Sequence, residues 1–328
     1  MPNPIIQVAH VTKSFSVPAK GKRGWKSLFY RKTLRVDVIK DINFTIDEGE
    51  FIGYIGPNGA GKSTTIKLLT GILHPSEGNI SVLDFNPYEN RYQYTYHIGV
   101  VFGQRSLLEY DIPVIDSFHL YRAIYELDQK TFDERLEEFT SILKLSELFH
   151  IPVRKLSLGQ RMRCEIAASL LHNPKVIFLD EPTIGLDALA KHDIRLFLKR
   201  INQTENITII LTTHDMDDIE ELCERIIFIN EGEIIFDGPL LTLKNKYVTH
   251  KDIEITYEEP IEIPDRFQSL VKNVNAHTYT FNVRYEDAVQ FVPQLLKLGP
   301  ARDVSIHEQS LEDIVKIIYK NHASKPLQ

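Results

Sequence analysis

The sequence predicts an α/β fold, in which helices alternate with the strands of a parallel sheet, followed by a smaller α+β domain. Continuous apolar runs at residues 98–102, 176–179 and 207–211 are typical of strands buried on both faces of a parallel sheet. Helical patterns separate these runs, as expected for alternating strands and helices. After Asn245 the pattern changes to polar–apolar alternation, which is typical of half-buried strands.

The first domain is expected to cover residues 1–245. Within it, residues 51–55 lead through a glycine-rich turn into a helix from Lys62 to Leu69 that Gly71 stops. Residues 114–149 carry helical periodicity with little strand signal. We therefore expect a helical subdomain inserted at about residues 111–172, and a basic insertion occupies about residues 17–36.

The second domain is expected to cover residues 246–328. Its predicted strands at residues 252–257, 278–283 and 303–307 are each followed by a helical stretch. Ser310 and Asp313 predict a capping box at the start of the last helix. We favour a structural or dimer-stabilising domain; the alternative is a regulatory ligand site, although no cluster of residues there indicates one.

Composition and charge narrow the class of protein. The chain of 328 residues is 43% hydrophobic and 25% charged, which allows a globular core and more than one domain. Its net charge of −7 argues against general binding to nucleic acid, which needs a basic face. Cys164 and Cys223 lie in apolar helical patterns, which favours buried free thiols. No apolar run approaches the ~20 residues that cross a bilayer, and the first residues do not resemble a signal peptide. If the protein serves a membrane, another chain must provide the spans.

A glycine-rich segment after residues 51–55 matches the pattern G-x-x-x-x-G-K-[ST] of phosphate-binding loops. Glycines let backbone N–H groups approach an anion, and the following helix adds its positive end. The Lys62 side chain would reach the β and γ phosphates, and the Ser63 hydroxyl would bind Mg²⁺. A chance match is the alternative, but here the loop lies between a buried strand and a helix. The predicted ATP-binding residues are therefore Gly56, Pro57, Asn58, Gly59, Ala60, Gly61, Lys62, Ser63 and Thr64.

Two acidic residues end the apolar run at residues 176–179. A carboxylate at the C-terminal edge of a strand can hold the Mg²⁺ shell, and we assign this role to Asp180. The next carboxylate, Glu181, could polarise the attacking water as a general base. An acidic turn after a core strand would be the commoner explanation if this feature stood alone. Its co-occurrence with the phosphate loop reverses that preference.

Further short motifs resemble those of the ATP-binding subunits of ABC transporters. Residues 156–160 are similar to the family's signature motif, with Leu158 where the commonest form has glycine, and residues 185–187 resemble its D-loop. Gln104 matches the Q-loop glutamine and His214 the switch histidine. All motifs occur in family order, over roughly the first 240 residues. The fold that this implies is a P-loop NTPase of the ABC type, with an inserted helical subdomain and a small C-terminal α+β domain.

The resemblance implies an ATPase that works as a dimer, either of this chain or with a paralogue. In the family, the signature loop of one subunit closes over ATP held by the phosphate loop of the other. His214 would contact the γ-phosphate, and Gln104 the metal and the attacking water. Phe15 is placed like the aromatic that stacks on adenine; the alternative is a core aromatic at the end of the first strand. The residues expected to contact ATP from the partner side are Ser157, Gly159, Gln160 and Asp187.

Finer details resemble the bacterial branch that pairs with ABC-2-type permeases, mostly exporters. These details are the Q-loop at residues 98–105, the insertion before Asp41 and the appendage ending in residues 310–314. The implied role is ATP hydrolysis that drives export through a separate permease, at the cytoplasmic face of the cell membrane. The permease contact is expected near Gln104 and the apolar stretch at residues 110–114.

Other kinds of ABC protein fit the sequence less well. A single phosphate loop and the lack of a long heptad coiled coil argue against translation-type and repair-type members. The alternative function is a soluble ABC-type ATPase that acts on ribosomes or nucleic acid. A nucleotide-binding scaffold that does not hydrolyse ATP is disfavoured, because Lys62, Asp180, Glu181 and His214 occur together.

The basic insertion has two interpretations. Residues 20–35 combine seven basic residues with Trp25, Leu28, Phe29 and Tyr30 and contain no acid. A solvated loop is one interpretation; contact with anionic lipid headgroups or with the permease is the other. Co-sedimentation with liposomes, compared with a charge-reversed insertion, distinguishes the two, since equal binding contradicts lipid contact.

Overall fold

The computed structural model describes residues 4–18, 33–103, 106–247, 250–308 and 310–323. Two compact units make up the chain, residues Met1–Pro239 and Leu240–Gln328. Most of the basic insertion, residues 19–32, lies outside the described residues, as does Gln104. Among the described residues no helix is both long and apolar enough to span a bilayer.

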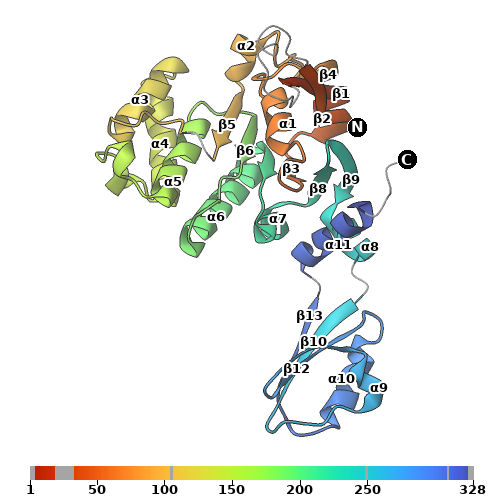
Figure 1. Ribbon diagram of the computed structural model, residues 1–328. Helices are drawn as coiled ribbons and strands as arrows, with labels where there is room; N and C mark the ends of the chain where they lie inside the picture. Colours follow the sequence, from red (N-terminus) through yellow and green to blue (C-terminus); the bar gives the residue numbers. More distant parts are fainter. Residues whose placement is uncertain (1–3, 19–32, 104–105, 248–249, 309, 324–328) are drawn as a thin grey trace, which may run out of the picture. The chain divides into compact units, whose positions relative to one another are not determined.

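The centre of the larger unit is a six-stranded sheet (Figure 1). Five of its strands are parallel, and the last pairs antiparallel at one edge. The strands are, in sheet order, β5 (Ile98–Phe102), β6 (Val176–Asp180), β7 (Thr208–Thr212), β3 (Phe51–Ile55), β8 (Arg225–Asn230) and β9 (Glu233–Pro239). Every residue of β3 and β7 is buried, as continuous apolar strands of a covered parallel sheet should be. The predicted α/β fold is therefore confirmed.

A second, antiparallel sheet in this unit was not predicted. It contains β2 (Thr33–Asp47), β1 (Pro4–Pro18) and β4 (Glu77–Val82) in that order. Register shifts interrupt the pairing of β1 with β2 at several points, and His10 and Asp41 adopt positive φ there. Such bulges place extra residues in the strand, so the two-residue alternation is lost. This loss of alternation removes the pattern from which such a sheet could be predicted.

The helices of the larger unit fall into two groups. Those attached to the sheets are α1 (Lys62–Leu69), α2 (Arg91–Thr95), α6 (Ala188–Glu205) and α7 (Met216–Leu222). The second group lies together at one side of the unit (Figure 1), within the range predicted for a helical subdomain: α3 (Val114–Ile124), α4 (Gln129–Leu143), α5 (Leu158–Leu170) and the 3-10 turns η2 (Ser146–Leu148) and η3 (Val153–Lys155). Their shared core includes the fully buried Phe118, Phe132, Phe139 and Leu143. Helix α4 also packs on α6, where the rings of Phe139 and Phe197 meet edge to face at 5.4 Å.

The smaller unit contains a four-stranded antiparallel sheet with its own core. The strands are, in sheet order, β11 (Val271–Asn275), β12 (Thr278–Arg284), β10 (His250–Tyr257) and β13 (Ala301–Glu308), and the helices are α8 (Leu240–Tyr247), α9 (Asp265–Gln268), α10 (Ala288–Leu296) and α11 (Leu311–Ala323). Alternate residues of β10 and β12 are buried beneath α10, including Ile255 and Phe281. Strand β11 was not predicted, because most of its residues are exposed.

The capping interaction predicted for the last helix is present in altered form. The Ser310 hydroxyl accepts a hydrogen bond from the backbone N–H of Asp313 at 3.2 Å. It donates to the Asp313 carboxylate at 2.9 Å, so the two side chains pair with each other. Both cysteines are buried and free, as expected.

Candidate functional site

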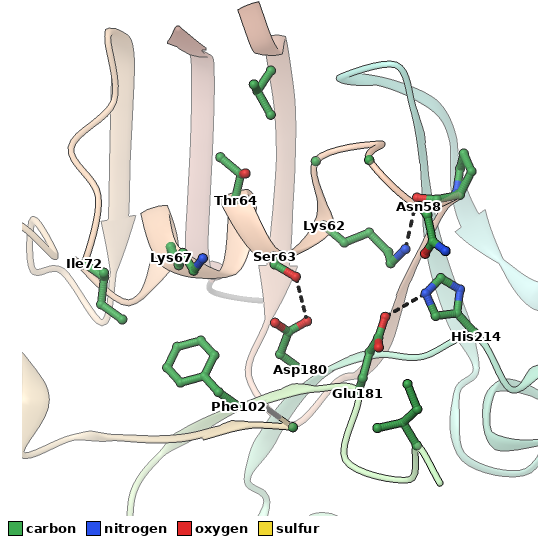
Figure 2. Close-up of a pocket in the computed structure, with 16 residues that line it drawn as sticks. Asn58, Lys62, Ser63, Thr64, Lys67, Ile72, Phe102, Asp180, Glu181 and His214 are labelled. Atoms are coloured by element: carbon green, nitrogen blue, oxygen red, sulfur yellow. Dashed lines mark hydrogen bonds and ion pairs between the residues drawn. The ribbon is translucent and has the colours of Figure 1, made fainter. Parts of the chain in front are cut away.

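A cavity of about 630 Å³ lies where α1 begins and the parallel strands end (Figure 2). In a parallel sheet the carboxyl ends of neighbouring strands meet at one edge, which is where such folds bind ligands. The described lining residues are Val38, Pro57, Asn58, Gly59, Gly61, Lys62, Ser63, Thr64, Lys67, Ile72, Phe102, Gly103, Asp180, Glu181, Ile184 and His214.

The loop between β3 and α1 forms one wall of this cavity. Gly61 precedes the first helical residue with φ of +114°, a conformation that L side chains rarely adopt. A Cβ atom there would also lie 2.5 Å from the Ile39 side chain, so only glycine fits. The first residues of α1, Lys62, Ser63 and Thr64, line the cavity, and the backbone N–H groups at a helix N-terminus have no partner within the helix. This is a favourable place for an anion.

The Lys62 side chain lies against the same loop. Its ammonium donates to the carbonyl oxygens of Gly56 at 2.7 Å and Pro57 at 3.1 Å. Burial lowers the pKa of Lys62, while the nearby charges of Glu181 and Asp180 act in the opposite direction. The positive charge at the cavity thus faces two carboxylates and has room for a further anion.

Asp180 is held at the end of β6 by two hydroxyl groups. Thr212, paired with it across β6 and β7, donates to its Oδ1 at 2.6 Å, and Ser63 donates to the same atom at 3.3 Å. The Ser63 and Asp180 oxygens therefore converge on one side of the cavity. Hard oxygen ligands of this kind fit Mg²⁺. Among the described residues no group of three or more His, Cys, Asp or Glu side chains could hold a metal ion alone.

Glu181 and His214 meet at the opposite side of the cavity. Glu181 Oε1 lies 2.7 Å from His214 Nε2, and both side chains are partly exposed to the cavity (Figure 2). The Glu181 backbone has φ of 57°, which is sparsely populated by non-glycine residues and costs on the order of 1 kcal/mol. Its N–H donates to the Thr212 carbonyl at 2.9 Å, which fixes this strained turn.

The residues assigned to the partner side lie elsewhere and do not line the described cavity. Ser157 caps α5: its hydroxyl accepts from the Gln160 N–H at 3.2 Å, and Gln160 Oε1 accepts from the Ser157 N–H at 2.9 Å. Asp187 caps α6 by accepting from the Ala190 N–H at 2.8 Å. A Cβ atom on Gly159 would lie 3.1 Å from the Ala190 Cβ, so the beginnings of α5 and α6 are packed closely.

Phe15 does not line the cavity either. It lies on β1, is 36% exposed, and has the Lys13 ammonium 5.2 Å from its ring centroid. The predicted Gln104 is outside the described residues, although its neighbours Phe102 and Gly103 line the cavity.

Several lining residues escaped the sequence analysis, among them Val38, Lys67, Ile72 and Ile184. They belong to no short motif, and their positions follow from how β2, α1 and the turn after β6 pack. Thr212 could have been found, because a threonine ending a strand beside β6 aligns with Asp180 in a parallel register.

The comparisons with known proteins decide the family. The family model described as ABC transporter matches residues 39–184. An uncharacterized ABC transporter ATP-binding protein of Bacillus subtilis (strain 168), YdbJ, is 32% identical over 285 residues, which span 84% of this chain and 88% of that protein. The chain belongs to the ABC transporter ATP-binding proteins.

Two further comparisons bear on activity and on the kind of transporter. The dimeric ATP-binding cassette MJ0796, solved in a post-hydrolysis state with ADP and Pi, has a TM-score of 0.61 and 27% identity, covering 72% of this chain and 98% of that one. The methionine import ATP-binding protein MetN 1 of Acinetobacter baylyi is 29% identical over 89% of this chain and 83% of its own length. The chain is thus an ABC transporter ATP-binding subunit and an ATPase, as the sequence predicted.

Proposed function

We propose that this ABC subunit works as one half of a dimer that hydrolyses ATP at its interface and drives export through a separate ABC-2-type permease. One observation supports the proposal of a dimer. Lys62, Asp180 and Glu181 line the described cavity, whereas the signature residues at the start of α5 do not. A second chain would complete the site by placing Ser157, Gly159 and Gln160 over the nucleotide, with Asp187 at the same interface.

The residues predicted from the sequence have the following roles in this proposal. The loop N–H groups and Lys62 bind the phosphates, and Phe15 stacks on adenine. Ser63 and Asp180 hold Mg²⁺, which supplies charge compensation at the phosphates when it is bound. Glu181 accepts a proton from the attacking water. His214, held against Glu181, orients that carboxylate and contacts the γ-phosphate. Gln104 contributes to the metal and water positions.

The proposed permease and direction rest on the sequence resemblance. Within the stretch at residues 110–114, Tyr110 supports a docking role, because its side chain is 59% exposed, whereas Val114 is buried. The subunit would then lie on the cytoplasmic face of the membrane without spans of its own. An import role, as in the name of MetN 1, is the competing direction.

Replacing Glu181 tests the hydrolytic part. Glu181→Gln keeps the side-chain shape but cannot accept the proton, so we expect ATP binding to persist while turnover falls by ~10²-fold or more. Near-normal turnover in a folded variant would remove Glu181 from the mechanism. ATP affinity by titration and phosphate release by a steady-state assay measure the two quantities.

Purification from membranes tests the transport part. The tagged chain, isolated in mild detergent, is expected to bring with it a membrane protein, which mass spectrometry identifies. A cysteine at Tyr110 is expected to crosslink to that protein. ATPase activity that RNA or ribosomes stimulate, without any membrane partner, would contradict the transport role and support the soluble alternative.

A further inference from the structure

A fully buried carboxylate, Asp218, lies in a hydrogen-bonded cluster outside the described ATP cavity. It belongs to α7 and has no exposed surface. Its Oδ2 accepts from the hydroxyls of Thr183 at 2.5 Å and Thr213 at 3.0 Å. Its Oδ1 accepts from Arg195 Nε at 2.6 Å and Nη2 at 2.5 Å. Both carboxylate oxygens therefore have partners.

The partners of Asp218 come from segments that carry the residues proposed for hydrolysis. Thr183 follows Glu181 by two residues, and Thr213 directly precedes His214. Both threonines are almost fully buried, at 3% and 2% exposure. One carboxylate thus ties the turn after β6 to the segment after β7, and the Glu181–His214 contact of 2.7 Å lies between those same two segments.

The ionised carboxylate determines which groups in the cluster donate hydrogen bonds and which accept them. An ionised carboxylate only accepts, so both threonine hydroxyls must donate to it and their rotamers are fixed. Thr213 Oγ1 in turn accepts the backbone N–H of Asp215 at 3.0 Å, which orders the residues on both sides of His214. Arg195 balances the buried charge: burial alone would lower its pKa, but its hydrogen bond to Asp218 and the surrounding acids raise it.

We propose that Asp218 is a positioning residue for ATP hydrolysis. By holding Thr183 and Thr213 it fixes the distance between Glu181 and His214, the two groups proposed to act on the water and the γ-phosphate. The inference rests on the proposed roles of those two residues. Arg195 extends the tie to α6, the helix that Asp187 caps.

Three substitutions test the positioning role. Asp218→Asn keeps the shape but replaces one acceptor oxygen with a donor NH2 group, so the side chain can no longer accept from both the threonines and Arg195. Thr183→Val and Thr213→Val each remove one hydroxyl at constant size. We expect kcat to fall by ~10-fold or more in each, as for other losses of alignment, while the ATP affinity changes by less than ~2-fold. Glu221→Gln is the matched control, because Glu221 Oε2 binds the outward side of the same Arg195 at 3.0 Å and should leave kcat unchanged.

A double-mutant cycle separates positioning from simple structural support. In a His214→Ala background, Thr213→Val should lower kcat by less than ~2-fold, because the residue it positions is already gone. Losses that multiply would overturn the proposal, and so would normal kcat in folded Thr183→Val and Thr213→Val. The valine variants keep the test valid if Asp218→Asn does not fold.

The same measurements distinguish failure of the inference from failure of the proposed function. Near-normal turnover in Glu181→Gln and His214→Ala would overturn the roles on which the inference depends. Impaired turnover in those two variants, with normal turnover in the valine variants, would overturn the role of Asp218 alone.

Discussion

At the scale of single residues, His172 shows how burial alters proton affinity in the helical subdomain. Its ring stacks on Tyr125 with centroids 3.8 Å apart and planes 5° apart. Nε2 lies 2.9 Å from the Ile98 carbonyl oxygen, while Nδ1 has no partner among the described residues. Burial lowers the pKa of His172 to about 4, although the Ile98 carbonyl favours the protonated form. The ring is therefore neutral at pH 7 and donates through Nε2.

The lowered pKa of His172 predicts acid sensitivity of the unit that contains residues 1–239. Below its ordinary pKa of 6.5 the unfolded chain binds a proton at His172 that the folded chain does not. The free energy of unfolding of this unit is thus undiminished near pH 7 and falls as the pH is lowered toward 4. At pH 5 the loss in the free energy of unfolding is about 2 kcal/mol.

Urea unfolding at pH 7 and pH 5 measures this loss. His172→Phe keeps a stacking ring that cannot titrate, so we expect a smaller difference between the two pH values than in the parent chain. The exposed His192 on α6 supplies the control, because His192→Phe should leave the difference unchanged. An equal pH difference in His172→Phe and the parent chain contradicts the assignment.

At the scale of an element, the start of α5 has two roles that substitution can separate. Ser157→Ala removes one cap and should lower stability by about 1 kcal/mol. If Ser157 also contacts ATP in the partner subunit, turnover should fall at least ~10-fold, as for other lost transition-state donors. Asp128 caps α4 in the same way, accepting from the Thr131 N–H at 3.0 Å. Asp128→Ala should show the same loss of stability with normal turnover. Equal turnover in both variants removes Ser157 from the composite site.

The elements whose bounds the sequence predicted best are α1 and the central strands of the parallel sheet. Helix α1 and strand β5 have the expected bounds, β6 extends one residue further, and β7 is shifted by one residue at both ends. The strands are largely apolar, and glycines lie just before and after α1, so the limits of these elements appear in the sequence. The sheet of β1, β2 and β4 could not be predicted in this way, because bulges remove its alternation.

The residues of the candidate site also fall into those that the sequence could predict and those that it could not. Lys62, Ser63, Asp180 and Glu181 follow strand ends within short motifs, and their convergence follows from parallel strand order. The tie through Asp218 could not be predicted, because it joins side chains from α6, α7 and two loops by tertiary packing.

At the scale of the whole molecule, every residue that lines the described cavity belongs to the unit Met1–Pro239. The proposed site is nevertheless incomplete in one chain, since the signature residues do not line that cavity. In a symmetric dimer each site would take its phosphate loop from one copy and its signature motif from the other. A copy with a defective phosphate loop and a copy with a defective signature motif should therefore form one intact site when they dimerise.

Mixing Lys62→Ala with Ser157→Asp tests this composite site. The first variant weakens phosphate binding; the second keeps the cap of α5, since aspartate is also a good cap, but places a negative charge opposite the γ-phosphate. Each alone should be inactive. At equal amounts half of the dimers are mixed and hold one intact site, so about a quarter of the parent activity should return. Mixing Lys62→Ala with Glu181→Gln is the control, because both defects lie in the same half and no intact site can form. Recovery in the control, or none in the test mixture despite subunit exchange, would contradict a site shared between two chains.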